Sequence, residues 1–207
     1  GTRPSSRSWG ATTGGTSWLP TPYTVAYNPN SSNDLDKPTM ACDVVTGSPY
    51  LNNVYVSYRK NNDIYFSRKA AAADTFSTPN IISDVSLTNG SSIAVGPNGI
   101  IYVGWVRFPT TYGTTQVEMR IDKSTDGGAS FGTDKLISTA TKPAGTGWPL
   151  KNPAWIAANP FPSVAVDNSG GPTRGRVYAV WTDTRNGDPD IYLSLSTDNG
   201  GIWSNTP

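Results

Sequence analysis

The chain has 207 residues, with 16 basic and 15 acidic side chains, no histidine, one cysteine and a formal net charge of +1. This balanced charge excludes binding to nucleic acid through a strongly basic surface. The residue counts also exclude the usual zinc sites and a Ser-His-Asp triad, and no apolar run is long enough to cross a membrane as a helix. The single cysteine, Cys42, has no partner for an internal disulfide, and we expect it to be a buried apolar side chain.

Short strands, rather than helices, are expected along the whole chain. Gly, Pro, Ser, Thr and Asn are abundant, and no long apolar stretch has the period of about 3.6 residues that marks an amphipathic helix. Alternating apolar and polar residues predict strands instead. In chain order, the predicted strands cover residues 38–43, 54–59, 63–68, 91–95, 101–106, 117–123, 162–167, 177–182 and 190–195.

A turn motif of the form Ser-x-Asp-x-Gly-x-x-aromatic follows two of the strand groups. Asp and Ser side chains can hydrogen-bond the backbone of a tight turn, and Gly supplies a positive φ angle. The terminal aromatic residue would anchor the returning strand, so we assign a structural role to the motif. Its residues are Ser124, Asp126, Gly128 and Phe131 in the first copy, and Ser196, Asp198, Gly200 and Trp203 in the second.

The strands and turns repeat together as one unit. Two degenerate copies of the turn, ending in Trp18 and Phe76, stand at residues 11–18 and 69–76. Four short antiparallel strands in each repeat are what a β-propeller blade requires, so we predict an all-β propeller segment of about three and a half blades. Its expected parts are the end of one blade (1–37), two blades (38–90 and 91–161) and a blade truncated in its last strand (162–207).

The two complete turns resemble the Asp-box (BNR) repeats of sialidases and related secreted β-propellers. The resemblance implies that the chain is secreted or extracellular and that it acts on or recognises glycans. It also implies that the boxes are structural turns, away from the ligand site. A non-catalytic extracellular scaffold or interaction propeller is the alternative function.

A ligand would meet the loops at the opposite end of the blades from the boxes. The long loops at this end combine charged groups, which can bind the carboxylate or hydroxyls of a sugar, with aromatic rings that stack on its apolar face. A local salt bridge between Asp183 and Arg185 that stiffens their loop is the other interpretation of that pair. The candidate ligand-binding residues are Arg107, Tyr112, Trp148, Trp155, Asp183 and Arg185.

Whether the chain is catalytic stays open at this stage. The resembled sialidases use an arginine triad, a Tyr–Glu nucleophile pair and an Asp acid/base, whereas this chain has the single glutamate Glu118 and lacks the family's Phe/Tyr-Arg-Ile-Pro motif. A glycosidase needs two carboxylates across a cleft. The nearest candidates, Asp183 and Asp188, lie on one loop, so further blades or another chain would have to complete an active site and the ring.

No cofactor is expected, with calcium as the one exception to consider. The acidic loop at residues 33–37 could bind calcium through Asp34, Asp36 and backbone carbonyls. Solvated loop carboxylates are the other interpretation of the same residues.

Overall fold

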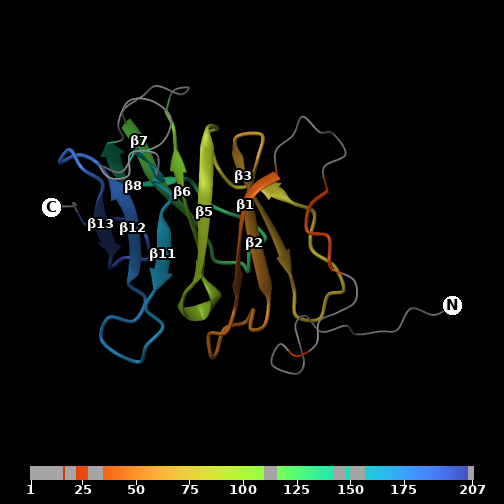
Figure 1. The fold of residues 1–207 in the computed structure, drawn as a ribbon. Coiled ribbons are helices and arrows are strands. Elements are labelled where there is room, and N and C mark those ends of the chain that lie inside the picture. Colours follow the sequence, from red (N-terminus) through yellow and green to blue (C-terminus); the bar gives the residue numbers. More distant parts are fainter. Residues whose placement is uncertain are drawn as a thin grey trace.

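The described residues form three larger antiparallel β-sheets that stand side by side (Figure 1), and a small two-stranded sheet. The computed structural model describes residues 16, 22–27, 35–109, 116–141, 148–149 and 157–204. The first sheet contains β1 (Leu35–Cys42), β2 (Val54–Lys60), β3 (Asp63–Lys69) and β4 (Asn80–Ile81) in that order. The second contains β5 (Thr88–Val95), β6 (Ile101–Arg107), β7 (Gln116–Ser124) and β8 (Lys135–Thr141).

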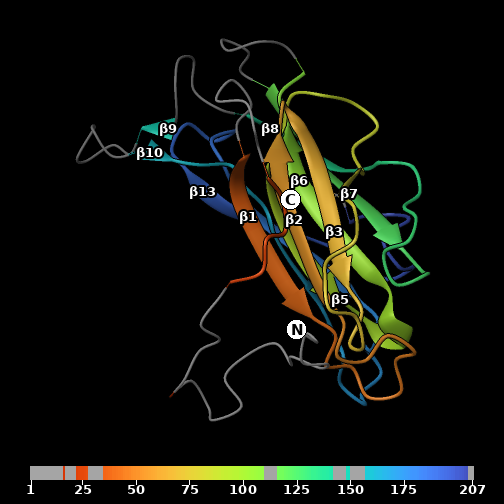
Figure 2. The same ribbon diagram turned by 90° about the vertical axis from the view of Figure 1, so that its right-hand side faces the viewer.

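The third sheet has three described strands, β11 (Ser163–Val166), β12 (Val177–Asp183) and β13 (Asp190–Ser196). A separate pair of two-residue strands, β9 (Trp148–Pro149) and β10 (Ala157–Ala158), lies between the second and third sheets in the sequence. Figure 2 shows this pair away from the three sheets. The described residues contain a single helical element, the 3-10 turn Pro97–Gly99.

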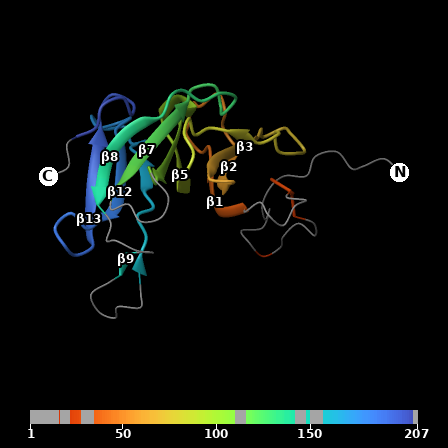
Figure 3. The same ribbon diagram turned by 90° about the horizontal axis from the view of Figure 1, so that it is seen from above.

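The three sheets share one register, which places equivalent loops at the same end of each sheet. The hairpins begin with the pairs Lys60 with Asp63, Arg107 with Glu118, and Asp183 with Asp190. Seen from above, the inner strands β1, β5 and β11 are neighbours while the outer strands fan apart (Figure 3). This is the arrangement of consecutive blades around an axis.

Buried aromatic and branched side chains fill the spaces between the sheets. Between the first and second sheets, Phe66 and Trp105 are fully buried. Between the second and third, Met119 and Trp181 belong to a separate cluster. A Cβ atom at Gly104 would lie only 2.6 Å from a methyl carbon of Val164, so the glycine lets β11 approach β6 closely.

Every predicted strand coincides with an observed strand to within a few residues, and the all-β prediction with four-stranded antiparallel units is confirmed. The described strands do not close a ring. Between β8, which ends at Thr141, and β11, the β9–β10 pair was not predicted. Two-residue strands are too short for an alternating pattern to reveal them.

The expectation that Cys42 is buried was wrong, because its side chain is exposed. Successive side chains of a strand point to opposite faces. The preceding residue, Ala41, packs against the buried cluster between the first and second sheets. Cys42 therefore points to the other face of β1.

Candidate functional site

The Ser-x-Asp turn after β7 is held together by one carboxylate. Asp126 Oδ1 accepts hydrogen bonds from Ser124 Oγ (2.7 Å), Ala129 N (2.9 Å) and Ser130 N (3.0 Å). Ser124 Oγ in turn accepts from Gly128 N at 2.8 Å. Burial opposes ionisation of Asp126, but the bonds from Ser130 and Ser124 outweigh it and hold the pKa of this carboxyl well below its usual range.

The turn after β13 repeats these bonds to one carboxylate oxygen, but it lacks the bond from Ser130 Oγ to Asp126 Oδ2, because Ile202 stands at the matching position. Asp198 Oδ1 accepts from Ser196 Oγ (2.7 Å), Gly201 N (3.0 Å) and Ile202 N (2.8 Å). The bond from Ile202 N, followed by the one from Ser196, lowers the pKa of Asp198. Trp203 is buried at the end of the turn, whereas the corresponding Phe131 is half-buried against Phe66. The hydrogen bonds that Asp126 and Asp198 accept all come from their own turns, so both carboxylates serve local structure.

A charged cluster occupies the opposite end of the second sheet. Glu118 Oε2 accepts from Arg107 Nη1 at 3.0 Å and from Arg120 Nε at 2.7 Å. Burial alone would raise the pKa of Glu118, but the hydrogen bonds from Arg120 and Arg107 lower it below its ordinary value. The carboxylate is therefore ionised near neutral pH and unsuited to donate a proton. Two guanidinium groups therefore surround this one carboxylate.

Arg120 was not among the residues predicted from the sequence. It stands two positions after Glu118 on β7, so it lies on the same face of the strand. Arg107 reaches the same carboxylate from the neighbouring strand, where it pairs with Glu118. The alternation of Glu118 and Arg120 was a usable signal, although only the strand register shows that Arg107 joins them.

Asp183 and Arg185 form the local salt bridge that was one of the two interpretations of their loop. Asp183 is fully buried, and its carboxylate accepts from Arg185 N at 2.9 Å and Arg185 Nε at 2.8 Å. Burial raises the pKa of Asp183, but the bonds from Arg185 and from Thr141 N outweigh this and lower it.

The same two residues also tie the third sheet to the second. Thr141 N, at the end of β8, donates to Asp183 Oδ1 at 3.0 Å, and Arg185 Nη2 donates to the carbonyl oxygen of Thr139 at 2.8 Å. The Arg185 guanidinium also lies 4.5 Å from the centre of the Tyr192 ring. These contacts give Asp183 and Arg185 a role in blade-to-blade packing.

The remaining rim candidates cannot be placed as side chains. Tyr112 and Trp155 lie outside the described residues, and Trp148 is described only as part of the backbone pair β9–β10. Asp34 of the acidic loop is also outside the described residues, while Asp36 accepts a hydrogen bond from Lys37 N at 2.8 Å. No group of three or more metal-binding side chains occurs within the described part of the chain, and calcium binding stays a prediction.

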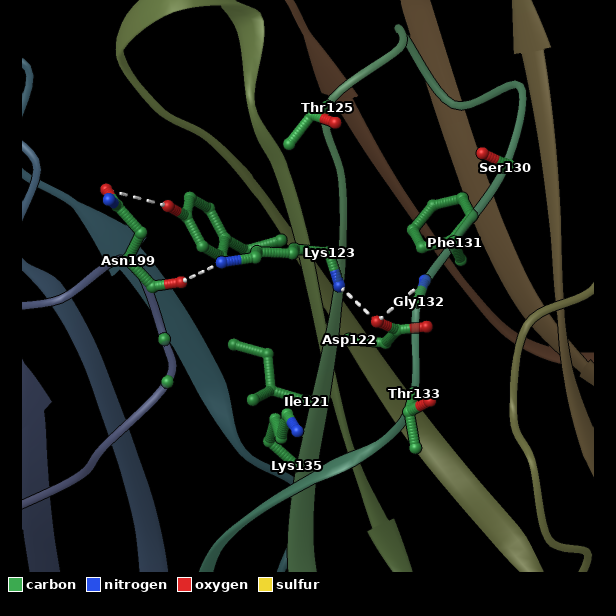
Figure 4. Close-up of a pocket in the computed structure, with 13 residues that line it drawn as sticks. Ile121, Asp122, Lys123, Thr125, Ser130, Phe131, Gly132, Thr133, Lys135 and Asn199 are labelled. Carbon is green, nitrogen blue, oxygen red and sulfur yellow. Dashed lines mark hydrogen bonds between the residues drawn. The ribbon is translucent and has the colours of Figure 1, made fainter.

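A pocket of about 300 Å³ lies at the box end of the second sheet, between the turn of residues 130–133 and that of residues 199–201 (Figure 4). Lys123 Nζ crosses it to donate to the carbonyl oxygen of Asn199 at 2.9 Å. The sequence did not reveal this pocket, because its walls come from two boxes that lie far apart in the chain. The lining residues include Tyr102, Ile121, Asp122, Lys123, Phe131, Lys135 and Asn199.

Comparison with solved structures identifies the architecture. The Hadza microbial sialidase Hz136 is similar over 83% of this chain and 38% of its own length, with 14% identity and a TM-score of 0.52. A family 117 glycoside hydrolase from the marine bacterium Zobellia galactanivorans matches over 88% of this chain and 58% of its own, with 13% identity and a TM-score of 0.52. These structures are β-propellers, and the likeness shows that this chain has the fold of propeller glycosidases.

An α-L-arabinanase from Penicillium chrysogenum is also similar, over 83% of this chain and 48% of its own, with 13% identity and a TM-score of 0.51. The chain therefore spans less than two thirds of each of these structures. No protein-family profile and no curated protein sequence matches it. None of the helical structure in the described residues has the length and apolar character needed to cross a membrane.

Proposed function

We propose that this chain is part of a secreted, sialidase-like Asp-box propeller that acts on or recognises glycans. The observation that carries the proposal is the shared fold with sialidases and other glycoside hydrolases. The box turns support the Asp-box assignment, because in both turns one aspartate gathers the serine hydroxyl and two backbone amides. The ligand would bind at the loop end opposite these turns.

Within that loop end, the arginine cluster around Glu118 is the best-supported place for an acidic sugar. Arg107 and Arg120 share the single carboxylate of Glu118, and both side chains are partly exposed, so their guanidinium groups can attract a sugar carboxylate. Tyr112, Trp148 and Trp155 would supply aromatic surface on the neighbouring loops. Arg185 is a weaker candidate than Arg107, because its guanidinium is committed to Asp183 and Thr139.

The test is a titration of the chain with one sialylated and one neutral glycan. We expect Arg107→Gln to weaken the acidic glycan by about 1.5–3 kcal/mol, the value of a hydrogen bond to a charged group, and to spare the neutral one. Arg174→Gln is the matched control, since Arg174 lies on the β11–β12 connection at the other end of the third sheet and bonds only nearby carbonyls. Equal affinities for wild type and Arg107→Gln would contradict the site.

A scaffold or interaction propeller is the second candidate function. It is favoured by the use of Asp183 and Arg185, two of the candidate ligand residues, in holding the second and third sheets together. On this alternative, neither glycan binds and the loops serve contacts with protein partners. Absence of binding to a broad glycan array, with the fold intact by circular dichroism, would place this function first.

A further inference from the structure

Two aspartates join the first and second sheets through a reciprocal pair of hydrogen bonds. Asp84, in the connection from β4 to β5, donates its backbone N–H to Asp134 Oδ2 at 3.1 Å. Asp134, just before β8, donates its own N–H to Asp84 Oδ2 at 2.9 Å. The residues are fifty positions apart in the chain, so the contact links two blades rather than two parts of one turn.

Two buried carboxylate oxygens at or near this contact have no hydrogen-bond partner. Asp134 is buried, and its Oδ1 has no hydrogen-bond partner. Asp122, on β7, is also buried; its Oδ1 accepts from Lys123 N and Gly132 N, whereas its Oδ2 has no partner. A buried ionised oxygen that lacks hydrogen bonds is costly, and a proton on the carboxyl removes most of that cost.

The charged groups around Asp134 do not neutralise its carboxylate. Asp84, in the β4–β5 connection, and Asp122, on β7, add negative charge beside it. Arg120 faces Asp134, but its Nε donates to Glu118. Lys123 faces Asp122, while its Nζ donates to the Asn199 carbonyl on the third sheet. Each nearby cation is therefore directed to another acceptor.

The pKa values of Asp134 and Asp122 are both raised, as expected for buried carboxyls in this geometry. Burial, strengthened by the charges of Asp84 and Asp122, raises the pKa of Asp134 to about 7. Burial, strengthened by the charge of Asp84, raises the pKa of Asp122 to about 6. Because the two carboxyls influence each other, their titration belongs to the pair.

We propose that the Asp84–Asp134 contact is a proton-dependent latch between two blades. With a proton on Asp134, its Oδ2 still accepts the N–H of Asp84, and the like-charge repulsion between the two carboxyls is absent. When Asp134 is ionised, the repulsion and the unpartnered buried oxygen weaken the contact. The latch depends on the packing of the first and second sheets, and Arg120, which faces Asp134, also belongs to the proposed sugar site.

The sign of the effect follows from the raised pKa. A carboxyl that holds its proton more tightly when folded stabilises the protein most below its unfolded pKa, and this contribution is lost as pH rises through the folded value. For Asp134 the window runs from the ordinary value of 3.8 to about 7. The latch is therefore closed in mildly acidic solution and loosened in mildly alkaline solution.

The experiment compares the full chain with Asp134→Asn, which mimics the neutral carboxyl, and with Asp74→Asn, an exposed control in the β3–β4 turn. Urea unfolding is measured at about pH 5 and about pH 8, where we expect the folding equilibrium constant of wild type to fall by about tenfold or more. Asp134→Asn should lose most of this dependence, and Asp74→Asn should keep it. Equal pH dependence in wild type and Asp134→Asn would overturn the latch.

Carboxyl carbon NMR of the wild type gives a second readout that does not require the variant to fold. We expect the Asp134 signal to titrate near neutral pH and the amide of Asp84 to exchange faster, relative to its intrinsic rate, once Asp134 is ionised. A midpoint for Asp134 at its ordinary value would refute the proposal. Stabilisation by added Ca²⁺ at about pH 8 in wild type but not in Asp134→Asn would also refute it, because a cation rather than a proton would then hold the carboxylates together.

Discussion

At the scale of single residues, the two Ser-x-Asp turns show why an aspartate is needed in the middle of the motif. One oxygen of Asp126 and one of Asp198 each collect a serine hydroxyl and two backbone amides. The amides belong to residues at the tip of each turn, where no strand partner is available. An ionised carboxylate offers about four acceptor sites, whereas a serine hydroxyl offers about two.

Replacing Asp126 by Ala should therefore destabilise the fold without changing any ligand affinity. The amides of Ala129 and Ser130 lose their acceptor, and we expect a cost of about 1–2 kcal/mol, partly compensated by water because the turn is near the surface. Urea unfolding measures the effect, with Thr125→Ala, an exposed neighbour, as control. A loss of glycan binding with unchanged stability would show that the residue belongs to a ligand site.

The carboxylate of Asp167 should make the stability of the protein depend on pH in acid. The hydroxyls of Thr173 and Ser169, together with the Ser169 amide, lower the pKa of Asp167 to about 2. A lowered pKa means that the stabilising contribution is present above the ordinary value and is lost as pH falls through the folded one. Thermal unfolding should shift downward between about pH 4 and about pH 2, and less steeply in Asp167→Asn. A variant as acid-sensitive as wild type would contradict this assignment.

At the scale of elements, the sheets are held together by rings that lie between neighbouring blades. Phe66 of β3 stacks on Tyr55 at 5.9 Å and meets Phe131 of the second sheet edge-on at 4.8 Å between ring centres. A Cβ atom at Gly128 would lie 2.5 Å from the Phe66 ring. The glycine of the box turn thus leaves room for the ring of the preceding blade, in addition to supplying its positive φ of 82°.

The substitution Phe66→Ala should be among the most damaging in the described core. It removes a fully buried ring from the contact between the first two sheets, and such truncations cost about 3–5 kcal/mol. Tyr65→Ala, next along the same strand, is the control, because Tyr65 points to the other face and is only half-buried. Equal destabilisation by both changes, measured by urea unfolding, would argue against this packing.

At the scale of the whole molecule, the third sheet presents an apolar face that its two counterparts bury. Ile64 and Met119 are fully buried against the next sheet, whereas Ile191, in the same register, is 75% exposed. Leu193 follows it on the same face and is 48% exposed. Exposed apolar surface in a position that is otherwise buried indicates an interface. We propose that a further blade, from this polypeptide or another chain, covers it.

This proposal predicts the behaviour of the chain in solution. We expect it to self-associate through the open face, and Ile191→Lys combined with Leu193→Lys to abolish that association while leaving the fold intact. Val44→Lys is the control, since Val44 is 76% exposed but lies in the connection from β1 to β2. Sedimentation at several concentrations measures the association, and a monomeric wild type that binds no hydrophobic dye would contradict the interface.

Much of the fold could be predicted from the sequence, because its signals are local. Strands appear as alternation over a few residues, and the box turns appear as side chains that bond amides three or four positions away. Less of the candidate site could be predicted. Arg107 was chosen for its loop, but only the register of β6 and β7 shows that it meets Arg120 at the carboxylate of Glu118.

What the sequence by itself determined, therefore, was the identity of the strands, the turns and their repetition. Only the tertiary structure decided which blades share a contact: Asp183 and Arg185 with the end of β8, Asp84 with Asp134, and Lys123 with Asn199. It also decided that Cys42 faces outward. The physical reason is that the two-residue alternation along a strand indicates only which residues share a face. What that face meets depends on the distance and rotation between sheets, which are set by the packing of all the buried side chains together.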